Sequence, residues 1–573
     1  MPQWDHEADV VVVGSGSAGM ATAWTAARRG LDVLIIEKTE VYGGNSAMSG
    51  GGAWMPNSPE LVRNGQQSDH NETLTYLRTI APDIDPKRQE RFLEECAKVA
   101  AALEETPYFR GGYYWGKGYS DYFPNKGGKA LGRGIWPNPI DRRILKGENN
   151  KIRESKLMAG APKGVWTTSA EIGDLIRVHW GGSLRRYKIM FRMAWRKIHY
   201  QLTGAEMITS GRSLMARMRM AVSDAGVPLW LNTAMTGLIT DDNGRVIGVE
   251  ATREGKPVLI GARRGVMIAA GGFEFNETMR RQLQPLLGGV GHSFGSPGNT
   301  GDGIRAGQAI GAATALLDDA WWMPGVDTPG EARAALMERQ APNQFIVNKL
   351  GERFVNEAGP YTEFGHAVLE GQAKGVDHSR FFMILDHEAW THNIVGSHLP
   401  GMPMPKGWID HGTLTVADTL DELAAKIGVP ADALKRTAER FNGFARAGRD
   451  EDFHRGESAY DNHYGDHRHK NPNLAPVEKA PFYAVRMLLG DLGTKGGLLT
   501  NENAQVLNPE GRPIPGLYAA GNSSASVMGN SYAGPGATIG PAMTFGWIAA
   551  HHIAGSNSTD GAAVRAPAEV AGR

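Results

Sequence analysis

The sequence is poor in cysteine and has no excess of either charge. Cys96 is the single cysteine among 573 residues, which excludes an intrachain disulfide and a metal site built on cysteine ligands. It also leaves little prospect of a thioether link to a cofactor. Lysine plus arginine and aspartate plus glutamate number 61 each, so nothing global indicates a nucleic-acid partner. We therefore predict neither a metal site nor binding to nucleic acid.

Long hydrophobic runs are also missing. No stretch reaches the ~18 apolar residues that a membrane-spanning helix needs. Residues 1–7 show neither the basic and apolar parts of a secretion signal nor a twin-arginine pair. No repeat or low-complexity linker divides the chain, and 41% hydrophobic with 21% charged residues is typical of a globular protein with an ample core. We expect a cytoplasmic protein.

Glycine, by contrast, is abundant, with 75 residues and no fixed period. Residues 9–13 predict a strand, followed by Gly14-Ser15-Gly16-Ser17-Ala18-Gly19, an alanine-rich helix, and a second strand that ends at Glu37. This order is the fingerprint of a dinucleotide site. Gly14 allows the turn, Gly16 admits a pyrophosphate to the helix N-terminus, and Gly19 lets helix and strand pack closely. Glu37 can accept a hydrogen bond from a ribose hydroxyl.

A second glycine-rich loop follows at residues 43–52. A further loop directly after the ribose acid suits a cofactor larger than NAD and favours FAD, although a surface loop would have the same composition. Small-residue loops at 270–271 and 521–522 end buried strands, where a dinucleotide is bound at a carboxyl edge. The candidate cofactor-binding residues are Gly14, Gly16, Ser17, Ala18, Gly19, Glu37, Lys38, Gly43, Gly44, Asn45, Ser46, Gly50, Gly51, Ala270, Gly271, Gly521, Asn522 and Ile539.

Two other segments predict a ligand site. Five tyrosine or tryptophan side chains lie among glycines at residues 113–122, either lining a ligand or packed as an aromatic loop. Near the end, a glycine- and proline-rich loop at 529–536 leads into an apolar helix, so unpaired N–H groups are expected near Gly536. With the phenol of Tyr532 they could hold a carbonyl that becomes an oxyanion. The alternative is a glycine-rich helix start packed against another element.

Residues 185–202 predict an amphipathic helix with an unusual charge pattern. Its apolar side chains recur at spacings of three and four, and it contains no acid. Such a helix either lies at a membrane surface or covers the core as an ordinary surface helix. The apolar stripe comprises Tyr187, Met190, Phe191, Ala194, Trp195, Ile198 and Leu202, and the basic residues are Arg185, Arg186, Lys188, Arg192, Arg196 and Lys197.

The pattern of elements predicts an α/β protein with a Rossmann-like FAD-binding domain and an inserted α+β substrate domain. Helices are expected at 69–80, 85–105, 213–225, 420–427 and 430–446, and strands at 227–252 and 381–385. We assign residues 1–315 and 488–573 to the FAD-binding domain, with a basic amphipathic region at about 140–204. Residues 316–487 are assigned to the substrate domain.

These segments together resemble the flavoproteins of the succinate dehydrogenase and fumarate reductase type, and within them the 3-ketosteroid 1-dehydrogenases. The likeness covers nearly the whole chain. Segments 14–19, 43–46, 299–303 and 516–522 match the wider group. The more specific matches are Ser120-Asp121-Tyr122, Asn356-Glu357-Ala358-Gly359-Pro360-Tyr361 and Tyr532-Ala533-Gly534-Pro535-Gly536.

The resemblance implies FAD and the 1,2-desaturation of 3-ketosteroids, for example 4-androstene-3,17-dione to the 1,4-diene, in steroid degradation. It implies Tyr361 as base towards carbon 2, Tyr122 as its support, and Tyr532 with the Gly536 N–H as the holder of the carbon 3 keto oxygen. Ala533 stands where many relatives have proline, and the chain is longer around 185–202. No histidine accompanies residues 43–46, so noncovalent FAD is expected.

The chemistry needs a base, an enolate clamp and a hydride acceptor. About one in a thousand tyrosine side chains of pKa ~10 is ionised at pH 7, so ionisation costs a free energy of roughly 4 kcal/mol. One oxyanion donor contributes ~3 to 4 kcal/mol, so two donors can offset a weak base.

Three other functions stay open at this point: a 4-ene-forming (5-alpha) dehydrogenase, a fumarate reductase-like flavoprotein, and a non-catalytic flavin or lipid-binding protein. The natural electron acceptor is undetermined, with a quinone as one candidate. Peripheral attachment to the inner face of the cytoplasmic membrane through 185–202 is the alternative to a purely cytoplasmic location.

Overall fold

The first strand of the chain lies inside an eight-stranded sheet of the computed structural model, which describes residues 2–155, 163–176, 180–287, 292–396, 398–400 and 402–555. Both faces of this strand are buried, which explains its run of valines. Its neighbours on both sides run parallel to it, and two further parallel strands extend the sheet. In spatial order these are β22 (Pro513–Ala519), β11 (Lys256–Ile268), β1 (His6–Val13), β2 (Val33–Ile36) and β8 (Leu229–Trp230).

Alternate valines of β1 enter two different cores. Val10 and Val12 pack with the helices on one face, whereas Val11 and Val13 pack with the antiparallel strands on the other. Those strands are β9 (Thr233–Thr240) and β10 (Val246–Arg253), which are joined by a turn at Asp242-Asn243-Gly244, and β21 (Gln505–Leu507). The sequence predicted two strands across 227–252, and the structure adds β8 as a third.

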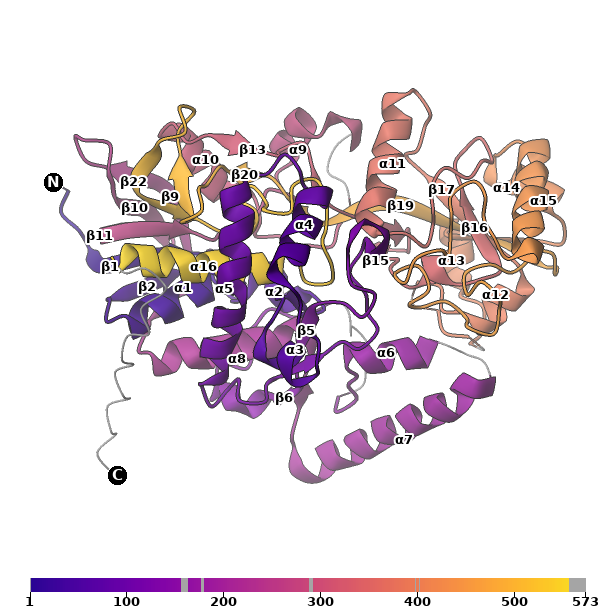
Figure 1. Ribbon diagram of the computed structural model, residues 1–573, viewed down its shortest axis with the longest axis horizontal. Helices are drawn as coiled ribbons and strands as arrows, with labels where there is room; N and C mark the ends of the chain where they lie inside the picture. The colour runs from indigo at the N-terminus through magenta and orange to yellow at the C-terminus, as the bar shows by residue number, and fades with distance from the viewer. Residues whose placement is uncertain are drawn as a thin grey trace.

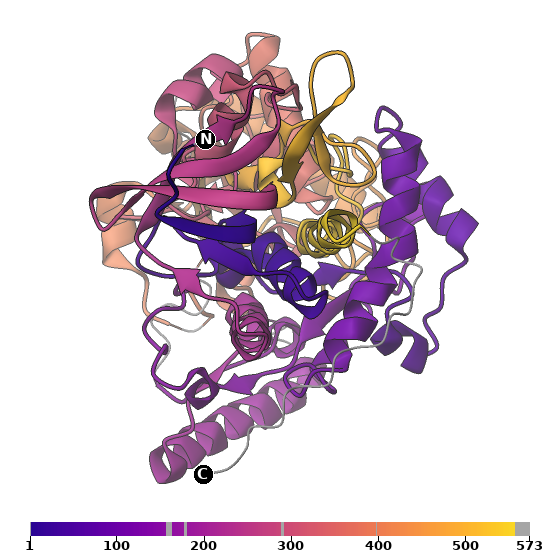
Figure 2. The same ribbon diagram turned by 90° about the vertical axis from the view of Figure 1, so that its left-hand side faces the viewer.

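The helical face brings the two ends of the chain together. Helix α16 packs along α1 and also contacts α5, as Figures 1 and 2 show. The approach is close because a Cβ at Gly546 would lie 2.5 Å from the carbonyl oxygen of Ala18. The helices concerned are α1 (Ser17–Arg28), α5 (Pro86–Glu104), α8 (Ser210–Asp224) and α16 (Ile539–Ile553).

A second sheet, of seven strands, is centred on β19. Helix α11 packs on β14, where Gly365 leaves room for the Trp322 side chain. Strand β19 spans position 487, which the sequence assigned to the end of the substrate domain. The strands are β12 (His292–Ser293), β14 (Ala320–Val326), β15 (Arg333–Ala334), β16 (Gln344–Val347), β17 (Phe381–Leu385), β18 (Leu414–Ala417) and β19 (Phe482–Thr494), with helices α11 (Tyr361–Ala373), α12 (His387–His392), α13 (Lys406–His411), α14 (Leu420–Ile427) and α15 (Ala431–Ala447).

The mixed architecture confirms the predicted α/β class. The remaining helices and strands lie around and between the two sheets. They are α2 (Gly44–Met48), β3 (Ala53–Trp54), α3 (Pro59–Arg63), α4 (His70–Ile80), β4 (Tyr113–Trp115), β5 (Gly134–Pro137), β6 (Ile140–Asp141), α6 (Ser169–Ile176), α7 (Trp180–Thr203), β7 (Met207–Ile208), α9 (Glu277–Leu283), α10 (Asp302–Ala309), β13 (Thr314–Ala315) and β20 (Gly497–Leu498).

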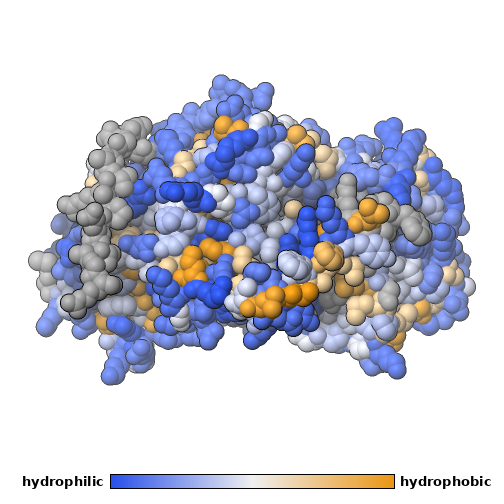
Figure 3. Space-filling view, turned by 90° about the horizontal axis from the view of Figure 1, so that it is seen from below, coloured by the Kyte–Doolittle hydropathy of each residue, from blue (hydrophilic) through white to orange (hydrophobic). Residues whose placement is uncertain are grey.

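The long helix α7 lies at the lower edge of the molecule in Figure 1, next to α6. Its apolar stripe faces outward, with Phe191 73% and Trp195 60% exposed, and hydrophobic side chains mark this face in Figure 3. Arg196 instead turns inward, where it pairs with Glu171 at 2.8 Å and lies over the Trp166 ring. The side chains of Arg185 and Arg186 lie outside the described part. The stripe therefore does not cover the core as an ordinary surface helix would.

Among the described residues, none of the helices combines the length and the apolar character needed to cross a membrane.

Candidate cofactor and active site

The turn between β1 and α1 requires glycine at two positions for different reasons. Gly14 has a φ of +106°, and a Cβ there would lie 2.2 Å from the Ala269 carbonyl oxygen. A Cβ on Gly19 would lie 2.0 Å from the Gly14 carbonyl oxygen. At Gly16, which caps α1, the nearest atom to such a Cβ is Ser46 Oγ at 3.6 Å. Room therefore remains at the helix N-terminus for a pyrophosphate.

Glu37, the residue after β2, connects the neighbouring loops through hydrogen bonds. One Glu37 carboxylate oxygen accepts hydrogen bonds from the Ser15 Oγ at 2.5 Å, and the other accepts from the Thr39 amide at 3.0 Å. Ser15 Oγ in turn accepts from the Gly43 amide at 3.1 Å. The Lys38 Nζ pairs with Asp302 at 2.7 Å. These contacts hold the ribose-binding candidates in place at the carboxyl edge of the sheet.

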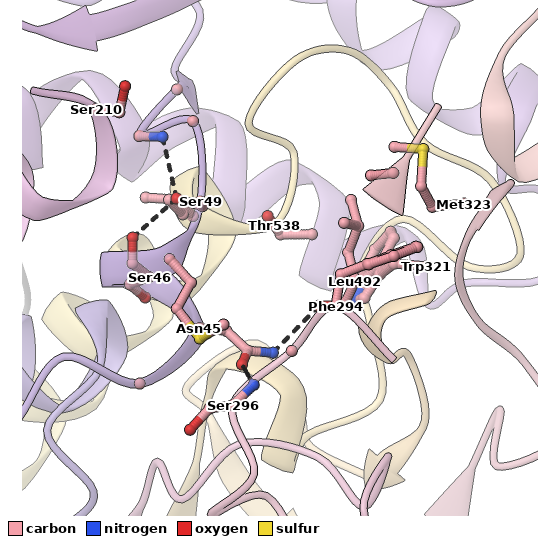
Figure 4. Close-up of a pocket in the computed structure, with 18 of the residues that line it drawn as sticks. Asn45, Ser46, Ser49, Ser210, Phe294, Ser296, Trp321, Met323, Leu492 and Thr538 are labelled. Atoms are coloured by element: carbon pink, nitrogen blue, oxygen red, sulfur yellow. Dashed lines mark hydrogen bonds between the residues drawn. The ribbon is translucent and has the colours of Figure 1, made fainter. Parts of the chain in front are cut away.

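Asn45 joins three segments of the cavity wall (Figure 4). Its Nδ2 donates to Glu274 Oε1 at 2.9 Å and to the Leu492 carbonyl at 3.1 Å, and its Oδ1 accepts from the Ser296 amide. Burial, with Asp491 nearby, raises the pKa of Glu274 to about 7. The Asn45 amide thus has protein partners on both of its ends and orders the wall around the cofactor loops.

One cavity of about 1140 Å³ unites the predicted residues. It is lined by all the candidate cofactor-binding residues except Gly19 and Gly43, and by all four candidate catalytic residues. Gly19 faces Gly14 and Val12, and Gly43 faces the Ala47 side chain, so both act in packing the loops. The space beside Gly16, the N-terminus of α1 and the carboxylate of Glu37 fit FAD.

Three tyrosines from distant parts of the chain meet in this cavity. The Tyr122 hydroxyl donates to the Tyr361 hydroxyl oxygen at 3.0 Å, and both side chains are buried. The Tyr532 ring lies 5.0 Å from the Tyr122 ring and 5.5 Å from the Tyr361 ring, between centroids. The candidate base, its support and one candidate oxyanion donor are thus neighbours.

The backbone around position 533 orients two of these tyrosines. The Ala533 carbonyl accepts from the Tyr122 amide at 3.1 Å and from the Tyr76 hydroxyl at 2.6 Å. Asp121, which precedes Tyr122, accepts from the Trp54 indole at 2.9 Å and forms a buried ion pair with Arg133. The Tyr122 amide and the Tyr76 hydroxyl both bind the carbonyl of residue 533, a group that alanine and proline share.

The segment before Tyr361 is held by a buried ion cluster. Arg353 and Arg455 contact Glu357 at 2.7 and 3.2 Å, and they hold its pKa below the ordinary value although burial alone would raise it. Asn356 Oδ1 accepts from the Gly359 amide at 3.1 Å. Tyr361 is the first residue of α11 and lines the cavity, and the ion cluster fixes the segment that precedes it.

Burial raises the pKa of all three tyrosines. For Tyr361 the pKa lies well above 10, and the hydrogen bond from Tyr122 only partly counteracts this. Burial likewise raises the pKa of Tyr122 and Tyr532. The site is therefore assembled with neutral phenols, and Tyr361 becomes a base only with help from its neighbours and the substrate.

Gly536 presents its N–H to the cavity. Its φ is +85°, and a Cβ would lie 2.3 Å from Gly52, so only glycine fits. Its carbonyl accepts from the Trp54 amide at 3.0 Å, whereas its N–H finds no partner within the described chain. The sequence predicted a loop through this glycine that leads into a helix, and the structure agrees, because the positive φ at Gly536 is not helical and α16 begins at Ile539. The turn leaves the N–H available.

Several residues of the cavity wall were not predicted as site residues. Trp321 meets Tyr532 edge to face at 4.9 Å, and its indole donates to Asn522 Oδ1 at 3.2 Å. The run Trp321-Trp322-Met323 is unusual in the sequence, but no spacing of residues along the chain indicates which side chains Trp321 contacts. The other unpredicted wall residues include Trp136, Phe294, Met323 and Leu492, whereas Tyr119 belongs to the aromatic segment 113–122 that was expected either to line a ligand or to pack as a loop. The described lining contains Arg333 as its one arginine and lacks histidine, unlike a site that grips two carboxylates.

Comparison with known proteins assigns the chain to a family. The model of the FAD binding domain family matches residues 9–539, so the chain belongs to this family of flavoproteins. It is 44% identical to a 3-oxosteroid 1-dehydrogenase of Mycobacterium tuberculosis over 96% of this chain and 98% of that protein. Within the flavoproteins, the chain thus belongs to the 3-oxosteroid 1-dehydrogenase family, whose members are FAD-dependent oxidoreductases.

Two solved structures agree. The 3-ketosteroid delta1-dehydrogenase from Sterolibacterium denitrificans, in complex with 1,4-androstadiene-3,17-dione, is 38% identical, with a TM-score of 0.89 over 96% of this chain and 100% of that chain. The 3-ketosteroid-delta4-(5alpha)-dehydrogenase from Rhodococcus jostii RHA1, in complex with 4-androstene-3,17-dione, is 25% identical, with a TM-score of 0.67 over 97% and 98% of the two chains.

Proposed function

We propose that this protein is a FAD-dependent 3-ketosteroid 1-dehydrogenase that converts substrates such as 4-androstene-3,17-dione to their 1,4-dienes. The observation that carries the proposal is the Tyr122–Tyr361 hydrogen bond in the cavity to which Gly536 presents its N–H. A base and an enolate clamp are thereby placed beside the dinucleotide loops. The reaction removes a proton from carbon 2 and a hydride from carbon 1.

The keto oxygen at carbon 3 is held by two donors. The Tyr532 hydroxyl and the Gly536 N–H donate to it, and the negative charge that develops as carbon 2 loses its proton is stabilised there. Each oxyanion donor contributes ~3 to 4 kcal/mol. Because the pKa of Tyr361 is raised, the free energy needed to ionise it at pH 7 exceeds the roughly 4 kcal/mol of an ordinary tyrosine. Both donors are therefore needed.

Tyr361 accepts the proton from carbon 2, and Tyr122 donates a hydrogen bond to the resulting phenolate oxygen. The distance supports this role, since the two hydroxyl oxygens lie 3.0 Å apart and Tyr122 is within hydrogen-bond reach of the Tyr361 oxygen. The apolar and aromatic wall excludes water from the reacting carbons. FAD, when bound, supplies the acceptor for the hydride that leaves carbon 1. We propose that FAD is bound noncovalently by the loops at 14–19, 43–51, 270–271 and 521–522.

The three alternatives receive less support. A fumarate reductase site would need arginine and histidine gripping two carboxylates, and the described lining holds one arginine, Arg333, and no histidine. A 4-ene-forming dehydrogenase would share the keto clamp, but the relative of that activity is 25% identical, against 44% for a 1-dehydrogenase. A purely binding role would leave the buried tyrosine pair without a purpose.

One experiment tests the proposal. The purified protein is incubated with 4-androstene-3,17-dione and an artificial electron acceptor, and the product is analysed by mass spectrometry and NMR. We expect loss of two hydrogens and a new double bond between carbons 1 and 2. A bound flavin that steroid fails to bleach under anaerobic conditions would overturn the proposal.

We further propose reversible attachment of α7 to an anionic membrane surface. The exposed stripe of Tyr187, Phe191 and Trp195 lies beside the exposed Lys188 and Lys197, a combination typical of interfacial helices. Steroids partition into membranes, so attachment would place the cavity at the substrate reservoir. A quinone is the electron acceptor we propose, since it shares that membrane.

A further inference from the structure

A charge cluster behind the cavity wall takes no part in the proposed chemistry. Asp319, the residue before β14, accepts a hydrogen bond from Lys495 Nζ at 2.7 Å through one carboxylate oxygen. Its other oxygen accepts from the indole of Trp322 at 2.7 Å and lies 3.0 Å from His366 Nε2. None of these four side chains is part of the described cavity lining. Lys495 is 1% exposed, so folding takes its ammonium group out of water.

The ammonium group of Lys495 also contacts the ring of Trp321. Its Nζ lies 4.9 Å from the ring centroid, within the range of a cation–π interaction, which is strongest away from water. Pairing of Ala320 on β14 with Thr494 on β19 brings these two side chains together, because each is the next residue along its chain. Apolar side chains in place of a buried ion pair are often as stable or more so, so stability alone does not explain a lysine here.

Trp321 connects this cluster to the cavity, which it lines. Its ring meets Tyr532 edge to face, with 4.9 Å between centroids, and its Nε1 donates to Asn522 Oδ1 at 3.2 Å. Tyr532 is buried, and its hydroxyl is the proposed donor to the carbon 3 oxygen. A rotation of the Tyr532 ring would move that hydroxyl, and the Trp321 ring blocks one direction of this rotation.

We infer that Lys495, held by Asp319, is a positioning residue for Tyr532 and acts through the ring of Trp321. The inference rests on the proposed function, in which Tyr532 and Gly536 bind the enolate oxygen. A hydrogen bond weakens steeply when its angle departs from the preferred range, so a small shift of the Tyr532 ring slows the reaction while the steroid still binds. Lys495 therefore affects proton removal from carbon 2 more than it affects steroid affinity.

The same carboxylate also reaches the helix of the proposed base. His366 lies on α11, which begins with Tyr361, and its contact with Asp319 joins this helix to β14. Asp319 thus connects the helix that carries the base to the strand whose Trp321 supports the keto clamp. The cluster holds the two catalytic groups in one relative position, although it touches neither of them.

A double-mutant cycle on the holoenzyme tests the inference. Lys495→Met removes the charge but keeps most of the side-chain volume, and it is made in the wild-type and in the Tyr532→Phe backgrounds. Exchange of the carbon 2 protons of 4-androstene-3,17-dione with deuterated solvent is followed by NMR, with the flavin held reduced so that the hydride step cannot occur. Flavin reduction is followed separately by stopped-flow absorbance.

We expect Lys495→Met to slow both rates about tenfold in the wild-type background and at most about twofold in Tyr532→Phe, because residues that act through one another are not additive. The dissociation constant of the steroid should change by at most about twofold, since the cluster does not contact it. Lys256→Met, at the exposed start of β11, is the matched control and should keep the wild-type rates.

The outcomes that refute the inference differ from those that refute the proposed function. Unchanged rates in Lys495→Met, the same loss in both backgrounds, or an equal loss of steroid affinity refutes the positioning role while the dehydrogenase function stands. If Lys495→Met does not fold with FAD, Lys495→Gln, which keeps a donor for Asp319 without the charge, replaces it in the cycle. If neither variant folds, Lys495 is a structural residue and the inference fails. Wild type that neither exchanges nor desaturates the steroid refutes the proposed function itself.

Discussion

At the scale of single residues, Tyr361 is the group whose hydroxyl carries the proposed chemistry. Tyr361→Phe keeps the ring and removes the proton acceptor, so kcat should fall about 10²- to 10⁴-fold, the usual contribution of general base catalysis. The dissociation constant of the steroid, measured from the perturbation of the flavin spectrum, should change little. Tyr122→Phe removes only the supporting hydrogen bond and should be milder.

A variant Tyr361→Phe with wild-type turnover would place the base elsewhere. Tyr464 would then be the next candidate, since it lines the same cavity and is also buried.

Tyr532 differs from Tyr361 in the step that it serves. Because it is proposed to stabilise the enolate, Tyr532→Phe should slow both exchange of the carbon 2 proton with deuterated solvent and reduction of the flavin. The expected loss is about 10²- to 10³-fold, as for one oxyanion donor. Exchange is followed by NMR and flavin reduction by stopped-flow absorbance. Loss of flavin binding with no effect on either rate in reconstituted enzyme would contradict this role.

At the scale of elements, α11 and β14 are joined by a buried charge cluster. His366 Nε2 contacts Asp319 at 3.0 Å, and Lys495 contacts the same carboxylate at 2.7 Å. Burial alone would lower the pKa of His366, but its hydrogen bonds to Asp319 and Glu363 outweigh burial and raise the pKa to about 9. Protonation of His366 therefore stabilises the folded state, fully below pH ~6.5 and less as the pH rises through about 9.

This linkage predicts the behaviour of a variant that cannot titrate. The difference in thermal midpoint between wild type and His366→Gln should be largest near pH 6 and should shrink as the pH approaches 10. Thermal unfolding followed by circular dichroism at each pH measures it. A difference that stays constant over this range would show that His366 does not change protonation there.

The outward-facing stripe of α7 gives a prediction for membranes. Wild type should co-sediment with anionic vesicles at low salt and be released at high salt, because each lysine near such a surface contributes up to about 1 kcal/mol. Lys188→Glu and Lys197→Glu should weaken binding, whereas Lys256→Glu, at the exposed start of β11, is the matched control. Arg196 is unsuitable for this test because it pairs with Glu171. Wild type that stays in the supernatant at low salt would refute attachment.

The sequence predicts these elements unequally well, for physical reasons. The strand, glycine loop and helix at residues 9–29 follow from local rules of turn geometry and burial, and the structure confirms them. The period of α7 gave its apolar face but could not tell whether that face meets protein or solvent. Trp321 reaches Tyr532 only through pairing of β14 with β19, a long-range contact that no local pattern encodes.

At the scale of the whole molecule, noncovalent FAD has a direct consequence. Asn45 and Ser46 beside the flavin-binding loops bond to protein groups, and Cys96, the single thiol, is buried on α5, apart from the cavity lining. Acid or heat denaturation should therefore release the yellow chromophore into the supernatant, where its absorbance spectrum identifies it. Flavin that remains with the precipitated protein would contradict noncovalent binding.

The packing of α16 along α1, and of β22 beside β11, also has a consequence for how the protein is made. The first strand pairs with β2 at once and with β11 only after residues 256–268 are made, β11 in turn pairs with residues 513–519, and the loop that carries Tyr532 and Gly536 comes later still. At about 5–20 residues per second, roughly 25 to 100 s of synthesis separate β1 from β22. From the completion of β11 until β22 is made, the edge of β11 is uncovered, so nascent chains should need chaperones, and ribosomes that stop before residue 513 should release products for proteolysis.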